Sequence, residues 1–139
     1  MSVYTPASFE TAILTAFDGI WQKFTPVAYP NEPFDPTGLT KWARFSIQGD
    51  GASERIGGSN STELFMRSGL ITIQCFAQEK KSTDDLNTMI DLALSFLEVQ
   101  KIAGVLFSDV SPPQEIGPDG PWFQVAVTAR WRYFTKRVN

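Results

Sequence analysis

The sequence contains no histidine and only one cysteine, Cys75. Histidine is the commonest general base and metal ligand near neutral pH. Its absence excludes Ser–His and Cys–His nucleophile pairs and histidine-based zinc sites. One cysteine forms neither an internal disulfide nor a cluster of thiolate ligands. Cys75 lies within an apolar run, which is typical of a small buried hydrophobic residue. We therefore expect no metal site.

Long hydrophobic runs and nucleotide-binding motifs are also missing. No run of about 18 uncharged apolar residues occurs, so no membrane-spanning helix is predicted. The glycine-rich residues 49–61 (GDGASERIGGSNS) contain no lysine and match neither GxxxxGK[ST] nor GxGxxG. Because there is no nucleophile elbow either, we expect no cofactor and no enzymatic activity.

The chain has 139 residues, 42% of them hydrophobic, which suits one domain spanning residues 1–139. The net charge of −3 is uneven, because residues 130–139 hold four bases and no acid. A mildly acidic body does not favour a surface that grips phosphates. The basic end is typical of a solvated strand edge, although it could also contact an acidic neighbour or a nucleic acid.

Two amphipathic helices are predicted from spacings of three and four residues. The first follows Ser8 as its N-cap and is stopped by Pro26. Its apolar face comprises Phe9, Ile13, Phe17, Ile20 and Phe24. The second is capped by Ser82 or Thr83, with two aspartates in its first turn. Its apolar face comprises Leu86, Met89, Ile90, Ala93, Phe96 and Leu97.

Alternation of apolar and polar residues predicts strands at residues 42–48, 64–77, 102–110 and 122–134, with a short edge strand at 27–29. The polar, glycine-rich residues 49–61 between the first two predict a long projecting β-hairpin with a flexible tip. The proline-rich loop that follows the edge strand is expected to be anchored by Phe34. The order α-β-β-β-α-β-β predicts an α+β fold, with an antiparallel or mixed sheet of about four to five strands covered on one face by two helices.

Several large apolar residues alternate onto the face of the sheet that should be turned toward solvent. They would be unfavourable on a free monomer and natural at a subunit interface. Stacking of nucleic-acid bases on the tryptophans is less favoured, because large aromatic residues mostly form core. The outward-facing residues are Leu64, Met66, Leu70, Phe76 and Trp122.

A series of short motifs occurs in a fixed order: AYPNEPFDP, WARFSIQGDGASERIGG, RSGLITIQCFA, IAGVLF and EIGPDGPWFQVAVTARWRYF. With them, residues 27–134 resemble the tail terminator proteins of bacteriophages that have long, non-contractile tails. The resemblance implies an α/β fold with a helix-covered sheet, no cofactor and no catalysis. It implies a homo-oligomeric ring, usually of six copies, that caps the tail tube and ends its polymerisation.

The resemblance also implies partners and a location. The ring would contact the tail tube protein and a neck or head-completion protein, and DNA would pass through it without specific binding. It would lie in the virion at the head-proximal end of the tail, after assembly in the host cytoplasm. No membrane is involved.

A ring requires two different patches on each subunit, and the hairpin and the apolar sheet face supply two. We expect Asp50, Glu54 and Glu63 at the bore or the tube contact, and Arg130 and Arg132 at a subunit interface. The candidate assembly interface also includes Arg55, Ser59, Met66 and Arg67.

Two alternatives remain open at this stage. One is another ring-forming neck or head–tail joining protein. The other, from a different class, is a small soluble ligand-binding domain or enzyme.

Overall fold

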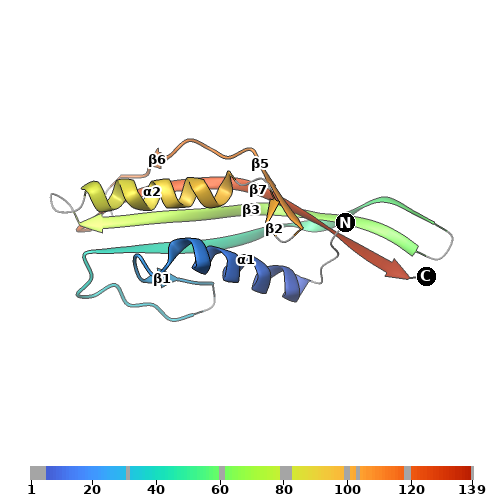
Figure 1. The fold of residues 1–139 in the computed structure, drawn as a ribbon, viewed down its shortest axis with the longest axis horizontal. Coiled ribbons are helices and arrows are strands. Elements are labelled where there is room, and N and C mark those ends of the chain that lie inside the picture. Colours follow the sequence, from blue (N-terminus) through green and yellow to red (C-terminus); the bar gives the residue numbers. More distant parts are fainter. Residues whose placement is uncertain are drawn as a thin grey trace.

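The computed structural model describes residues 6–30, 32–59, 62–78, 83–98, 101–102, 104–117 and 120–138. Three long strands dominate it, and two helices lie against one face of the sheet they form (Figure 1). The elements in chain order are α1 (Pro6–Trp21), β1 (Val27–Ala28), β2 (Lys41–Ser59), β3 (Thr62–Gln78), α2 (Thr83–Leu97), β4 (Lys101–Ile102), β5 (Val105–Ser108), β6 (Gln114–Glu115) and β7 (Trp122–Val138).

The strands form one sheet in the order β1-β2-β3-β7-β5-β4, and β6 pairs with β7 beside this path. β1 runs parallel to β2, whereas the other pairs are antiparallel, so the predicted α+β class with a mixed sheet is confirmed. The sheet has seven strands rather than four to five. The difference arises because the strand expected at residues 102–110 is split into β4 and β5, and because the two-residue β6 was not predicted.

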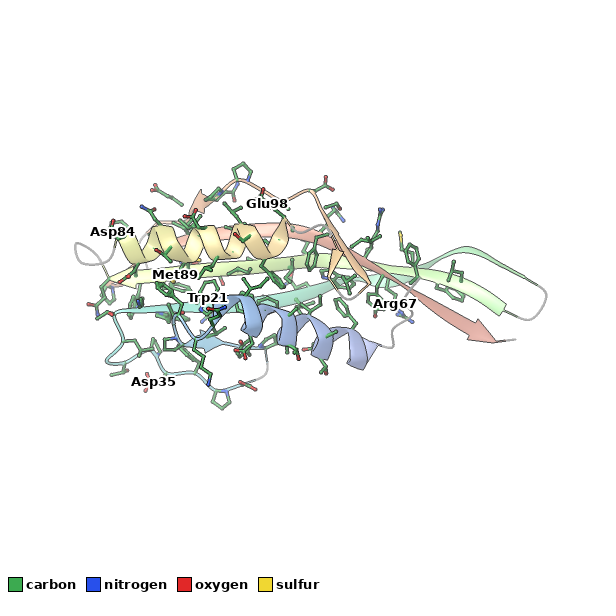
Figure 2. All side chains as sticks on the ribbon, in the orientation of Figure 1. Trp21, Asp35, Arg67, Asp84, Met89 and Glu98 are labelled. Carbon is green, nitrogen blue, oxygen red and sulfur yellow. The ribbon has the colours of Figure 1, made fainter. Side chains whose placement is uncertain are left out.

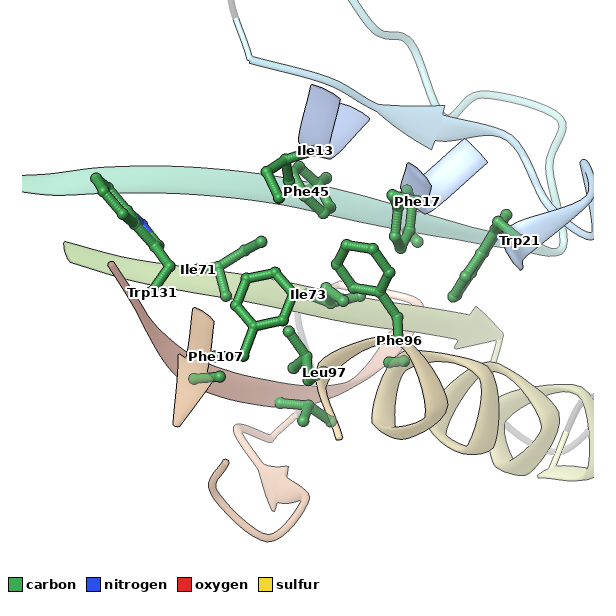
Figure 3. Packing of buried hydrophobic residues seen from close by; sticks show 14 of the residues in the cluster. Ile13, Phe17, Trp21, Phe45, Ile71, Ile73, Phe96, Leu97, Phe107 and Trp131 are labelled. Atoms are coloured by element: carbon green, nitrogen blue, oxygen red, sulfur yellow. The ribbon is translucent and has the colours of Figure 1, made fainter. Parts of the chain in front are cut away.

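The main core lies between the two helices and the sheet (Figure 3). Phe17 of α1, Phe45 of β2 and Phe96 of α2 meet there, with ring centroids 4.6 to 6.2 Å apart. Residues four apart along α1 fall on one side of the helix, which explains its buried stripe. That stripe is Phe9, Ile13, Phe17 and Trp21.

The boundaries of α1 differ from the prediction. The helix begins at Pro6, so Ser8 lies inside it and is not its N-cap. Proline suits the first helical position, because its missing N–H would have no partner there. The helix ends at Trp21, because Gln22 and Lys23 adopt positive φ angles of 50° and 57°. α2 begins at Thr83 with aspartates in its first turn, as predicted.

One exposed glycine in α1 offers a simple test of the helix. Gly19 has no heavy atom within 4 Å of the position that a Cβ atom would occupy. Gly19→Ala should therefore raise the free energy of unfolding by about 0.5–1 kcal/mol, because alanine loses less backbone entropy in a helix. Urea denaturation measures this change. A lower midpoint for the variant would contradict the helix assignment at this position.

The opposite face of the sheet carries a second aromatic cluster at one end. The rings of Trp42 and Phe76 stack at 3.9 Å, and Phe34 stacks on Trp42 at 5.0 Å. Phe76 and Trp122 lie on the face away from the helices, as predicted, but the expectation that they are turned toward solvent is wrong, because they are only 1% and 9% exposed. The loop between β1 and β2 folds back over them, and its Phe34 is the anchor that the sequence predicts.

The hairpin strands are longer than predicted, because residues 49–59 of the expected tip belong to β2. β2 extends to Ser59 and pairs with β3 up to Thr62, with register shifts at residues 49–53 and 55–57 that accommodate the glycines. β7 also pairs with β3 along its whole length, as far as Val138. The hairpin does project beyond the helices, but as three strands (Figure 1). We call residues 50–59, 62–68 and 132–138 the arm.

Candidate functional site

The arm joins the body at a junction between glycine and tryptophan. Gly69 lies in register with Gly49 on β2 and with Trp131 on β7. A Cβ atom at Gly69 would lie 1.9 Å from the carbonyl oxygen of Gln48 and 2.6 Å from Cζ2 of Trp131. The indole Nε1 of Trp131 donates a hydrogen bond to the carbonyl oxygen of Leu70 at 3.1 Å. The tryptophan ring thus fills the space that glycine leaves and fastens β7 to β3 where the arm begins.

The helix side of this junction is covered by α1. The ring of Phe9 lies 4.4 Å from that of Trp131 and 4.5 Å from that of Tyr133. Arg67 lies in register with Tyr133 at the base of the arm (Figure 2). Burial raises the pKa of Tyr133, and the positive charge of Arg67 partly opposes that rise. Within the described residues, the buried Nε of Arg67 has no hydrogen-bond partner.

The sheet face turned away from the helices is polar and basic. Arg44, Arg130 and Arg132 are exposed on it, and Leu70 among them is 36% exposed. Among the strand residues whose side chains the structure describes, none on this face is acidic. We call this surface the open face, formed by Arg44, Ser46, Gln48, Leu70, Thr72, Gln74, Gln124, Thr128, Arg130 and Arg132.

Aromatic rings support one of these arginines. The guanidinium of Arg44 lies 5.3 Å from the ring centre of Trp42 and 5.8 Å from that of Phe76. Both distances allow cation–π attraction, which restricts where the charge can lie. Farther along the face, Nε2 of Gln74 donates to Oε1 of Gln124 at 2.6 Å. The open face therefore has ordered polar groups.

The helices carry the opposite charge. α1 and α2 contain no basic residue. Asp85 of α2 faces the body, where it forms an ion pair with Lys41 at 3.4 Å. Asp84, Asp91 and Glu98 are exposed and spaced seven residues apart, and Figure 2 shows Asp84 and Glu98 at the two ends of α2. We call these three residues the acidic stripe.

The described residues offer little that suggests chemistry. No three acidic or cysteine side chains among them lie together in a way that could hold a metal ion. None of the helices described here is long and apolar enough to cross a membrane. One surface depression of about 420 Å³ lies beside β2, where Tyr29, Phe34 and Arg44 line it. Another of about 460 Å³ lies between the end of α2 and β5.

Cys75 gives a prediction about pH. Burial raises the pKa of the Cys75 thiol to about 12, whereas a thiol in an unfolded chain has a pKa of about 8.5. Above pH 8.5 or so the unfolded chain loses a proton that the folded chain keeps. The stabilisation from this group is thus complete below about pH 8.5 and lost as the pH rises toward 12, by up to about 1.4 kcal/mol per pH unit.

The measurement compares the wild type with Cys75→Ala in urea at pH 8, 9.5 and 10.5. The stability deficit of the variant should shrink as the pH rises, because alanine does not titrate. A deficit that stays constant over this range would contradict the prediction. Tyr29, whose pKa is also raised to about 12 by burial and by Asp18, titrates equally in both proteins and cancels in the comparison.

The predicted site residues are divided among three strands and two faces. Met66, Arg130 and Arg132 share the face away from the helices, whereas Arg67 lies on the helix side. The side chains of the other five lie outside the described residues, and only their strand positions are defined. On β2 these are Asp50, Glu54, Arg55 and Ser59, with Glu54 in register with Met66; on β3 it is Glu63, in register with Gly58 and Arg137.

Sequence reasoning missed three features of these surfaces. The acidic stripe could have been found, because its seven-residue spacing repeats every two helical turns. Arg44 joins the open face only because β2 pairs with β3. Trp131 was expected in the core. Nothing in the neighbouring sequence indicates that its ring lies over Gly69.

No protein-family model matches the sequence, and the comparison with curated proteins found no match. The fold is similar to that of a solved structure whose protein is identified only by a sequence number. The match covers 94% of this chain and 95% of that chain, with a TM-score of 0.61 and 14% sequence identity. At this identity the likeness shows the fold alone, which extends over nearly the whole of both chains.

Proposed function

We propose that this protein is a structural virion protein of the tail terminator type. Copies of the chain form a ring, six in the form that the sequence resemblance implies, which caps a tail tube and ends its polymerisation. The same ring presents the surface on which a neck or head-completion protein joins. The protein has no catalytic role in this proposal.

The observation that carries the proposal is the three-stranded arm. It projects beyond a body whose own core is complete, so the arm is available for contacts outside the subunit (Figure 1). A ring also needs two different surfaces on each copy, because its contacts are head to tail. The open face and the acidic stripe supply two surfaces of opposite charge.

The charge distribution supports passage of DNA through the ring rather than binding of it. Lysine and arginine contacts with phosphates hold DNA, most strongly at low salt. The chain has a net charge of −3, and its two helices contain acids without bases. In the proposal, the ring lies at the head-proximal end of the tail in the virion, after assembly in the host cytoplasm.

Purified protein mixed with polymerising tail tube protein tests the proposal. Electron microscopy should show shorter tubes as the protein concentration rises, with a ring at one end of each tube. A variant with a shortened arm is the comparison. In this variant Asn-Gly replaces residues 54–66. Ser53 and Arg67 are partners across the hairpin, so a two-residue turn can connect them.

The shortened variant should keep the helical circular dichroism of the wild type but lose the effect on tube length. Tubes whose lengths do not depend on the wild-type protein would contradict the proposal. So would normal capping by the variant. A ring that binds finished tails without limiting their length would favour a neck protein instead.

A further inference from the structure

We propose that copies of this chain contact one another head to tail, with the acidic stripe of one copy against the open face of the next. The occupant of the open face is therefore the outer side of α2 from a second copy. This inference rests on the proposed function, because it names the two subunit surfaces of the proposed ring.

The open face is suited to a charged protein surface. It carries three exposed arginines and one partly exposed leucine, on a sheet that the protein's own helices cover only on the other side. Arg130 and Arg132 project from the same side of β7, about 6.6 Å apart along the strand. Arg44 is supported by aromatic rings two strands away. The charges thus stand on one face of the sheet, with Arg44 held beside aromatic rings.

The acidic stripe is the matching surface on the opposite side of the molecule. Its carboxylates recur every two helical turns, about 10.5 Å apart along α2. Within the described residues, none of the three has an ion-pair partner, whereas the neighbouring Asp85 is neutralised by Lys41. The stripe therefore presents charge that no other residue described in the structure balances with an ion pair.

A second copy accounts for both surfaces, whereas a nucleic acid accounts for one. A polyanion on the open face would leave the acidic stripe without a role. A second copy brings each charge to its opposite. Because the two surfaces lie on opposite sides of the sheet, a contact between two copies leaves one of each free. Such a contact continues from copy to copy, and it closes into a ring where the rotation between neighbouring copies allows closure; otherwise it gives an open filament.

Reversal of charge on each surface tests the inference. The open-face variant is Arg130→Glu with Arg132→Glu, and the stripe variant is Asp91→Lys with Glu98→Lys. Sedimentation velocity at about 0.1 M salt, where the Debye length is about 10 Å, measures self-association. Each variant alone should associate at least tenfold more weakly than the wild type. If the wild type assembles only on the ends of tubes, the fraction of tube ends that carry a ring is counted by electron microscopy instead.

Mixing the two variants gives the sharpest expected result. Each variant carries one intact and one reversed surface, so in a 1:1 mixture both contacts between unlike variants join opposite charges. Association should therefore be restored, with the two variants alternating. A chain with all four substitutions should associate with itself again, because both charges have been exchanged. Glu115→Lys is the control, because this residue is exposed and lies outside the two surfaces. Circular dichroism establishes that each variant folds.

Several outcomes would overturn the inference. If the open-face variant and the stripe variant each associated as strongly as the wild type, the inference would fail, but the proposed ring would still stand. A failure of the mixture to restore association, with no recovery in the four-substitution chain, would also overturn it. So would loss of duplex DNA binding in the open-face variant without any change in self-association. A wild type that neither associates nor caps tubes would instead reject the proposed function itself.

Discussion

Replacing Gly69 by alanine should lower the free energy of unfolding by about 3 kcal/mol, at the upper end of the cost of overpacking. The added Cβ atom would lie 1.9 Å from the carbonyl oxygen of Gln48 and 2.8 Å from Cα of Gly49. Both neighbours belong to the backbone of β2, which cannot move aside as a flexible side chain can. Cζ2 of the Trp131 indole would also lie 2.6 Å from the added Cβ atom.

Gly57→Ala is the matched control, because Gly57 lies on β2 within the arm and has nothing within 4 Å of its Cβ position. It should change the stability by less than about 0.5 kcal/mol, as is usual for surface substitutions. Urea unfolding followed by tryptophan fluorescence measures both variants. Equal stabilities of Gly69→Ala and the wild type would show that the arm leaves the body by a different path.

Replacing Phe17 by alanine should be at least as costly, about 3–5 kcal/mol. Its ring packs against Trp21 at 5.0 Å, Phe45 at 4.6 Å and Phe96 at 5.4 Å, so it joins both helices to the sheet. Alanine would leave a cavity among rings that are themselves fully buried, and large rings cannot close it without moving a helix.

Phe123→Ala removes the same atoms from an exposed site. Phe123 is 42% exposed at one end of β7, so little contact is lost and water can enter. The expected loss is under about 1 kcal/mol, since surface substitutions have small effects. Thermal unfolding monitored by circular dichroism separates the two variants. Similar melting temperatures would contradict the placement of Phe17 at the centre of the core.

A dependence on salt should accompany the proposed contact between copies. Exposed charge pairs are screened over about 8 Å at physiological ionic strength, and they set orientation more than affinity. The arm carries bulges and glycines instead of a closed core, so it is suited to ordering against a partner. Tube contact through the hairpin part of the arm, residues 50–59 and 62–68, and subunit contact through the charged faces can therefore be varied separately.

The local sequence determined several features by itself. The three- and four-residue spacing of apolar residues located both helices, because only one side of each can face the core. Aspartates after Thr83 marked the start of α2, where the helix dipole favours negative charge. Alternation at residues 122–134 located most of β7, and the absence of histidine excluded whole classes of active site.

The tertiary structure alone decided the rest. Whether residues 49–61 form a loop or strands depends on pairing with β3, and the third strand of the arm depends on pairing across more than sixty residues. Phe76 and Trp122 alternate onto the outer face as expected, but a loop distant in sequence buries them. The need for glycine at position 69 depends on Trp131, whose ring occupies the space that a side chain would fill. Each of these depends on which segments meet, and local periodicity carries no information about distant partners.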